Sequence, residues 1–119
     1  MYYEKPQRTY IVKPEASCQD KGIYLTRNID DIELGEHCVV QRYITKPYLM
    51  DGLKFDLRLY VLLCGVDPLR IFIFRDGLAR LATEPYKGTN NNNLSRTCMH
   101  LTNYALNKNS GNFIHNTNA

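Results

Sequence analysis

The chain has 119 residues, of which 44% are hydrophobic and 23% charged; this excludes disordered and fibrous proteins and limits the chain to one small domain. Its 15 basic and 12 acidic residues give a formal net charge of +3, but they are scattered, without the basic stripe of a duplex-binding surface. The nine tyrosines are dispersed as well, which argues against a base-stacking platform. We therefore expect no nucleic-acid partner.

Membrane, disulfide and metal-binding classes are also disfavoured. The N-terminal run M-Y-Y-E-K-P-Q-R has no apolar signal core, and the longest apolar run, Leu59 to Val66, is far shorter than the about 20 residues that cross a bilayer. We expect a soluble cytoplasmic protein with no membrane partner. Four cysteines lack C-x-x-C pairing and histidines at zinc-ligand spacing, which predicts buried reduced thiols at Cys18, Cys38, Cys64 and Cys98.

The first half of the chain predicts short strands joined by loops. Three runs rich in β-branched and aromatic residues are expected strands: Tyr10 to Val12, Ile23 to Thr26, and Cys38 to Ile44. The first should end at Lys13-Pro14, because proline lacks a backbone donor. The polar segment to Gly22 predicts a loop, Asn28 to Ile32 a brief helical turn, and Lys46 to Gly52 a turn.

The second half predicts one long strand and one hairpin. Lys54 to Leu63 alternates between polar and apolar residues, as a strand with two different faces does. Leu69 to Phe74 is a second strand, Arg75 to Gly77 has the Asp-Gly signature of a hairpin turn, and Leu78 to Thr83 returns as its partner. Residues 87–96 contain few apolar residues and predict a mobile loop. The expected fold is α+β, with one twisted, mostly antiparallel sheet and few helices.

The polar face of the Lys54 strand carries charges at every second position. They belong to Lys54, Asp56 and Arg58. Alternate strand residues lie about 7 Å apart, so each cation attracts Asp56 by about 2.4 kcal/mol at an effective dielectric of about 20. Asp56 should be ionised, and one surplus positive charge remains for water or a bound anion. Alternation alone favours a solvated face, whereas Lys13, the Gly22 loop and Arg80 at other strand ends favour a phosphate site.

Several long motifs in series resemble one enzyme family. They are the runs I-V-K-P-E-A-S-C-Q-D-K-G-I, V-V-Q-R-Y-I-T-K-P-Y-L-M-D-G-L-K-F-D-L-R, L-A-T-E-P-Y and C-M-H-L-T-N-Y. These runs are similar to the tubulin tyrosine ligase-like family, in its polyglutamylase branch, and the likeness extends from Tyr10 to Asn112. It implies that residues 1–119 form part of an ATP-grasp domain, without the N-terminal lobe and the C-terminal segment that holds the metal ligands.

The resemblance implies an ATP-dependent ligase. Such an enzyme phosphorylates a glutamate carboxylate in the acidic C-terminal tails of tubulin, and the amine of free L-glutamate then attacks the acyl phosphate to form an isopeptide-linked branch. The implied cofactors are ATP and Mg²⁺, with the metal ligands expected outside this chain. The implied location is the cytoplasm, on the microtubule cytoskeleton, including the cilium or basal body.

The resemblance also implies an ATP site. Its residues are Lys13, Gln19, Asp20, Gln41, Arg42, Tyr43, Ile44, Lys54, Phe55, Asp56, Thr102 and Asn103. Lys13 would hold phosphates, the Gln19 loop would cover them, and Gln41 to Ile44 would line the adenine pocket, largely through backbone groups. Asp20 stands where family members usually have glycine, and its charge should weaken ATP binding unless the side chain turns outward.

The remaining implied roles concern catalysis and the amino-acid substrate. Lys54 and Arg58 would be catalytic, by stabilising phosphate charge. Arg80 would hold the carboxylate of the incoming L-glutamate, for which a guanidinium fork is suited, and Tyr104 would border that site. His100 is expected to be a packed residue rather than a base.

Three functions remain open from the sequence. The first is part of a tubulin polyglutamylase. The second is a non-catalytic remnant that binds ATP or microtubules, and the third is a glycylase or tyrosine ligase of the same family.

Overall fold

The computed structural model describes residues 7–15, 22–33, 35 and 37–115. The elements, in chain order, are β1 (Tyr10–Pro14), β2 (Tyr24–Thr26), the 3-10 helix η2 (Ile29–Asp31), β3 (Cys38–Arg42), β4 (Leu49–Met50), β5 (Leu53–Val66), β6 (Leu69–Leu81), α1 (Thr97–His100) and α2 (Tyr104–Asn107). The α+β class with mostly antiparallel strands and few helices is confirmed. In the described part of the chain, no helix combines the length and apolar character needed to span a membrane.

The strands form two sheets where the sequence predicted one. β1 lies between β2 and β3 in the first sheet, β5 lies between β4 and β6 in the second, and all of these pairings are antiparallel. β1 ends at Pro14, as the sequence predicts, because a missing donor costs little at the last strand position. The predicted helical turn is η2, and the side chain of Asn28 caps it by accepting a hydrogen bond from the Asp30 backbone at 3.2 Å.

The predicted hairpin turn at Arg75 to Gly77 is wrong. β6 runs unbroken through these residues, and the chain reverses instead at Asp67 and Pro68. Gly77 pairs with Leu59, next to a register irregularity, and a Cβ atom at Gly77 would lie 2.6 Å from the backbone oxygen of Arg58. The glycine therefore permits a close approach of two strands, which is the other common reason for a glycine in a strand.

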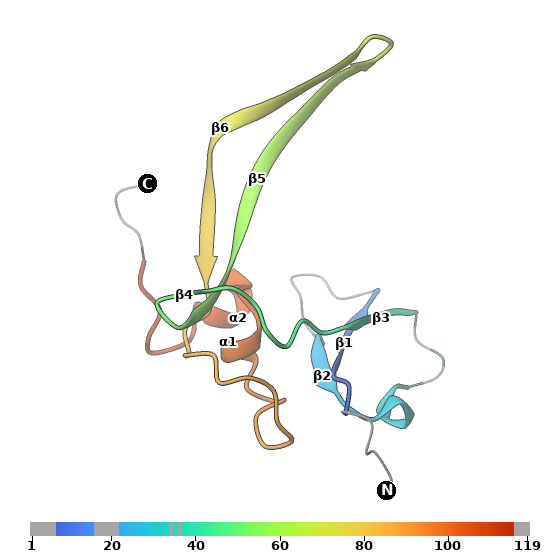
Figure 1. Ribbon diagram of the computed structural model, residues 1–119, viewed down its shortest axis with the longest axis vertical. Helices are drawn as coiled ribbons and strands as arrows, with labels where there is room; N and C mark the ends of the chain where they lie inside the picture. Colours follow the sequence, from blue (N-terminus) through green and yellow to red (C-terminus); the bar gives the residue numbers. More distant parts are fainter. Residues whose placement is uncertain (1–6, 16–21, 34, 36, 116–119) are drawn as a thin grey trace, which may run out of the picture.

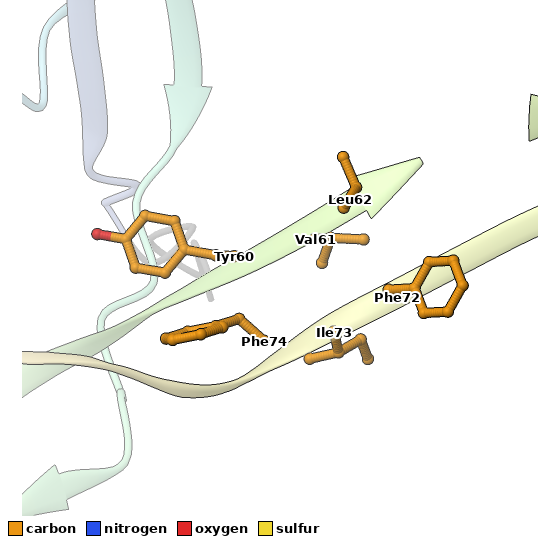
Figure 2. A pocket seen from close by; sticks show the side chains of 6 residues that line it. All are labelled: Tyr60, Val61, Leu62, Phe72, Ile73 and Phe74. Carbon is orange, nitrogen blue, oxygen red and sulfur yellow. The ribbon is translucent and has the colours of Figure 1, made fainter. Parts of the chain in front are cut away.

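The β5–β6 hairpin projects from the rest of the molecule as a long bent arm, with α1 and α2 at its base (Figure 1). On the arm, apolar side chains are exposed on both faces: Leu62 is 60% exposed and Ile73 is 67% exposed. Figure 2 shows a shallow apolar depression on this arm, lined by Tyr60, Val61, Leu62, Phe72, Ile73 and Phe74.

The hydrophobic core lies at the other end of the molecule. It consists of Ile11, Leu25, Tyr43 and Leu101, against which Ile23, Tyr86, Leu94 and Leu106 pack. Ile11 faces Leu25 across the β1–β2 pair, and Leu101 comes from the segment between α1 and α2. This core therefore joins the first sheet to the last third of the chain.

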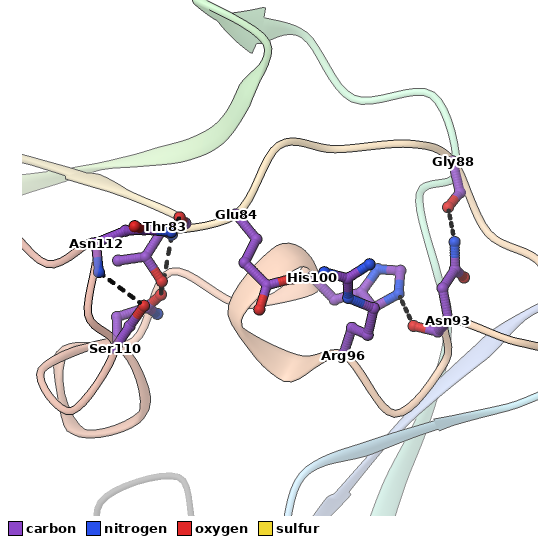
Figure 3. A network of polar contacts seen from close by, with 9 residues as sticks. Thr83, Glu84, Gly88, Asn93, Arg96, His100, Ser110 and Asn112 are labelled. Atoms are coloured by element: carbon purple, nitrogen blue, oxygen red, sulfur yellow. Dashed lines mark hydrogen bonds and ion pairs between the residues drawn. The ribbon is translucent and has the colours of Figure 1, made fainter.

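Residues 87–96 are irregular, as the sequence predicts, but well supplied with hydrogen bonds. Asn93 is 7% exposed; its Nδ2 donates to the Gly88 oxygen at 2.9 Å (Figure 3), and its Oδ1 accepts from the Asn90 backbone at 2.9 Å. Arg27 donates to the Thr89 backbone oxygen at 2.7 Å. The mobility of this loop stays a prediction.

The cysteines fit the sequence only in part. Cys38, Cys64 and Cys98 are free thiols, as expected. The prediction that they are buried is wrong for Cys64, which is exposed because it lies on the arm, and Cys38 and Cys98 are only partly buried. Cys18 lies outside the described residues.

Candidate functional site

Lys54, near the start of β5, is partly buried beside Tyr43, which follows β3, and His100, the last residue of α1. Its Nζ donates a hydrogen bond to the backbone oxygen of His100 at 2.7 Å and another to the hydroxyl of Tyr43 at 3.1 Å. The same atom lies 4.5 Å from the centroid of the Tyr43 ring, within the range of a cation–π contact. These contacts fix the position of the ammonium group.

The surroundings of Lys54 disfavour its positive charge. Burial lowers the pKa of Lys54 most, the carboxylate of Asp56 raises it, and the charge of Lys13 lowers it. Lys13 lies on β1, where its Nζ donates to Oε1 of Gln41 at 3.1 Å. Two ammonium groups from different sheets thus act on one another, and an anion between them would stabilise both charges.

Asp56 and Arg80 form an ion pair across β5 and β6. Arg80 donates through Nε to Oδ1 at 2.9 Å and through Nη2 to Oδ2 at 2.5 Å, which is the bidentate geometry of an arginine fork. The hydrogen bond from Arg80 lowers the pKa of Asp56 most; burial opposes it, while Thr102 and the charge of Arg58 lower the pKa further. Asp56 is therefore ionised at neutral pH, as predicted, but its main partner is Arg80 rather than Lys54 or Arg58.

We call Lys13, Lys54, Asp56, Arg58 and Arg80 the base cluster. It sets four cationic side chains against the carboxylate of Asp56, so its charge fits a polyanion such as the triphosphate of ATP. Within the described ranges, no three side chains of the His, Cys, Asp and Glu types gather as metal ligands would. The described side chains at this place therefore offer cations suited to an anion, without a cluster of metal-ligand types beside them.

Of the other predicted ATP residues, only some lie at the base cluster. Thr102 joins the base cluster through its hydrogen bond to Asp56, and the backbone oxygen of Asn103 accepts from the Leu106 and Asn107 backbones at 3.2 and 3.1 Å, where α2 begins. Gln41, Arg42 and Ile44 are exposed at and beyond the end of β3, whereas Tyr43 between them is buried.

Phe55 and Tyr104 make their described contacts away from the base cluster. The Phe55 ring packs edge-on against Tyr48, with centroids 6.3 Å apart. In the part of the chain that the structure describes, the Tyr104 ring contacts Phe113 at 5.6 Å and the ammonium group of Lys108 at 5.8 Å. Gln19 and Asp20 lie outside the described residues.

His100 is the site residue that the sequence did not assign. It is fully buried, as expected of a packed histidine. Its Nδ1 lies 3.1 Å from the Tyr43 hydroxyl and its Nε2 lies 2.8 Å from the Asn93 oxygen. The only signal for this role was the position of His100 beside Thr102 in the H-L-T-N run.

Comparison with known proteins agrees with the motifs. The family model described as "Tubulin-tyrosine ligase family" matches residues 1–118. The chain belongs to this family. The family resemblance predicted from the sequence is therefore confirmed.

Relatives within the tubulin-tyrosine ligase family carry polyglutamylase names. The chain is 61% identical over 110 residues to "Probable beta-tubulin polyglutamylase" of Tetrahymena thermophila, covering 92% of this chain and 9% of that protein. It is 55% identical over 111 residues to "Tubulin polyglutamylase TTLL13" of Mus musculus, covering 93% and 14%. It is 55% identical over 116 residues to "Tubulin polyglutamylase TTLL11" of Homo sapiens, covering 93% and 16%. The chain thus spans a small part of these family members.

Proposed function

We propose that this chain is part of an ATP-dependent tubulin polyglutamylase, which ligates L-glutamate to glutamate side chains in the acidic tails of tubulin. The observation that carries the proposal is the base cluster, in which the partly buried Lys54 lies beside Lys13 and the Asp56–Arg80 pair. The names of the relatives support the substrate and the reaction. ATP and Mg²⁺ are the proposed cofactors, with Mg²⁺ held by residues outside this chain.

When bound, ATP supplies the phosphoryl group that activates the acceptor carboxylate. Lys54 and Lys13 bind the phosphate oxygens. An ammonium group has three N–H donors, and Tyr43 and the His100 oxygen take two of those on Lys54, so the third is oriented toward a ligand. Burial lowers the pKa of Lys54 most and the charge of Lys13 lowers it further, and bound phosphates would oppose both effects by stabilising the ammonium form.

Arg58 and Arg80 act on the two other negative groups of the reaction. Arg58 is exposed on the same strand as Lys54 and stabilises the charge of the transferring phosphoryl group. Asp56 orients the guanidinium of Arg80 through two of its five N–H groups, and the oriented guanidinium binds the carboxylate of free L-glutamate.

The adenine base would lie at the end of β3, against Gln41 to Ile44. Gln41, Arg42 and Ile44 are exposed there, while the backbone N–H of Tyr43 donates to the Thr9 oxygen at 2.9 Å, so other backbone groups of this stretch would bind the purine. The acceptor would be an acidic tubulin tail, which places the protein in the cytoplasm, on microtubules, including those of cilia and basal bodies.

The test is amino-acid ligation by the full-length product of the gene that encodes this chain. The protein is incubated with tubulin, ATP and one labelled amino acid: glutamate, glycine or tyrosine. We expect ATP-dependent incorporation of glutamate alone, and none into tubulin whose acidic tails have been removed. Incorporation of glycine or tyrosine instead, or microtubule binding without any ligation, would overturn the proposal.

A further inference from the structure

Four groups form one hydrogen-bonded chain between the last third of the molecule and the two sheets. The Asn93 oxygen lies 2.8 Å from Nε2 of His100, and Nδ1 of the same ring lies 3.1 Å from the Tyr43 hydroxyl. That hydroxyl accepts from Nζ of Lys54 at 3.1 Å. His100 is 0% exposed and Tyr43 is 5% exposed, so water does not compete for these bonds. Figure 3 shows the His100 ring directed at the Asn93 oxygen.

The chemistry of the groups sets the direction of every proton in this chain. A carbonyl oxygen can only accept, so Nε2 of His100 carries a proton toward Asn93. In a neutral imidazole the other nitrogen is then an acceptor. The Tyr43 hydroxyl lies 3.1 Å from Nδ1 and 3.4 Å from the backbone oxygen of His100, and we assign its proton to the nearer acceptor, Nδ1. The lone pairs of the Tyr43 oxygen remain available to the ammonium group of Lys54.

This arrangement requires the imidazole to be neutral. Burial lowers the pKa of His100 most, the Asn93 hydrogen bond raises it, the charge of Lys54 lowers it, and Glu84 raises it. Glu84 is held by Arg96 at 2.7 Å. Two aromatic rings complete the surroundings, since Tyr43 and Tyr86 pack edge-on against the imidazole, at 5.4 and 6.0 Å. A protonated imidazole would instead donate from Nδ1, and the Tyr43 hydroxyl would face two cations.

We propose that His100 is a positioning residue for phosphate binding: it fixes the Tyr43 hydroxyl as an acceptor for Lys54, which directs the remaining N–H of Lys54 at the nucleotide. The inference rests on the proposed function for the role of Lys54 as a phosphate ligand. His100 itself touches neither nucleotide nor amino acid. Its side chain acts only through Tyr43, and its backbone oxygen holds the same ammonium group.

The test is calorimetric binding of ATP and of AMP to the full-length gene product, because phosphate contacts affect ATP more than AMP. His100→Gln retains a donor near Nε2 but loses the acceptor at Nδ1, whereas His100→Asn retains an acceptor near Nδ1. We expect Tyr43→Phe and His100→Gln each to weaken ATP binding about tenfold. AMP binding should change less than threefold, and His100→Asn should stay within about threefold of the wild type for both nucleotides.

The double variant Tyr43→Phe/His100→Gln shows whether His100 acts on ATP binding through the Tyr43 hydroxyl or only through its packing. If His100 acts through Tyr43, the second substitution adds no further loss of ATP affinity. A further tenfold loss, or equal losses of ATP and AMP affinity in all variants, would overturn the proposal. Unchanged ATP affinity in Tyr43→Phe overturns it even if the His100 variants fail to fold. Failure of the wild type to ligate glutamate while it binds ATP would refute the proposed function alone and leave this test intact.

Discussion

Strand β5 passes through two contrasting regions. At its base, the charged residues Lys54 and Asp56 are partly buried, and each has at least two polar partners. A few residues further along, Leu59 and Leu62 are each 60% exposed. Burial along this strand follows contact with the first sheet and with residues 82–107, and it does not follow hydrophobicity.

The contrast between the two regions of β5 indicates where a ligand would bind. Lys54, Asp56 and Arg80 are partly buried and carry one net positive charge, whereas Lys13 and Arg58 are exposed beside them. Because charged side chains are rarely buried unless they are paired, the surplus charge suits an anionic ligand. Scattered exposed apolar residues need no explanation, but an apolar surface on both faces of a long arm does. Under the proposed function, a bound polyanion would account for the surplus charge of the base cluster, whereas the exposed apolar residues of the arm have no such explanation.

The largest effect on activity is expected from replacing Lys54 of the base cluster. In the full-length gene product, Lys54→Met removes a preorganised positive charge, so we expect the rate of glutamate ligation to fall about 100- to 1000-fold. The matched control is Lys87→Met, which removes a lysine from the loop at 87–96, outside the base cluster. Equal ligation rates for the two variants would contradict a role of the base cluster in the reaction.

The next largest effect is expected on stability, at Gly77 of β6, which pairs with Leu59 of β5. A Cβ atom at Gly77 would lie 2.6 Å from a backbone oxygen of the paired strand, so Gly77→Ala should force the strands apart. We expect a loss of about 1 to 3 kcal/mol in the free energy of unfolding, measured by denaturant titration. Gly111→Ala is the control, because nothing lies within 4 Å of its added atom. A neutral Gly77→Ala would refute the close β5–β6 contact.

A smaller effect concerns pH and the buried His100. Since folding lowers the pKa of His100 below its ordinary value of 6.5, the unfolded chain binds the proton more readily. Stability should therefore be complete above about pH 6.5 and fall as the pH drops toward the lowered pKa, by at most about 1.4 kcal/mol per pH unit. Thermal unfolding of wild type and His100→Asn between pH 7.5 and 5 should show a steeper loss in the wild type. Parallel curves would contradict the buried neutral imidazole.

The smallest effect on the folded state is expected on the arm. Because Leu62 and Phe74 are exposed, at 60% and 66%, replacing both with glutamine should change the stability of the 119-residue chain by less than about 1 kcal/mol. The same change should reduce its self-association, which sedimentation velocity can measure, because it removes apolar contact area. Unchanged self-association would show that the arm does not mediate contacts between copies.

Sequence reasoning succeeded where the signal was local or came in long motifs. Asn28 predicted η2, β-branched runs predicted the three strands of the first sheet, and the motifs from Tyr10 to Asn112 predicted the family. It failed at Gly77, because a glycine in a strand that closely approaches its partner and a glycine in a turn look alike in the sequence.

Long-range contacts explain the rest of what sequence reasoning missed. Lys54 and the His100 oxygen are separated by 46 residues, and Tyr43 and the His100 ring by 57, so no spacing rule could join them. The same holds for the pairing of Asp56 with Arg80, which are 24 residues apart and meet only because β6 continues past the predicted turn.

The most direct test of the base cluster is the preference of the full-length gene product for ATP over AMP, measured as the ratio of their dissociation constants in wild type and Lys54→Met. If the cluster holds the phosphates, this ratio should fall at least tenfold in Lys54→Met, with AMP affinity nearly unchanged. An unchanged ratio would contradict the assignment of the base of β5 as a phosphate site.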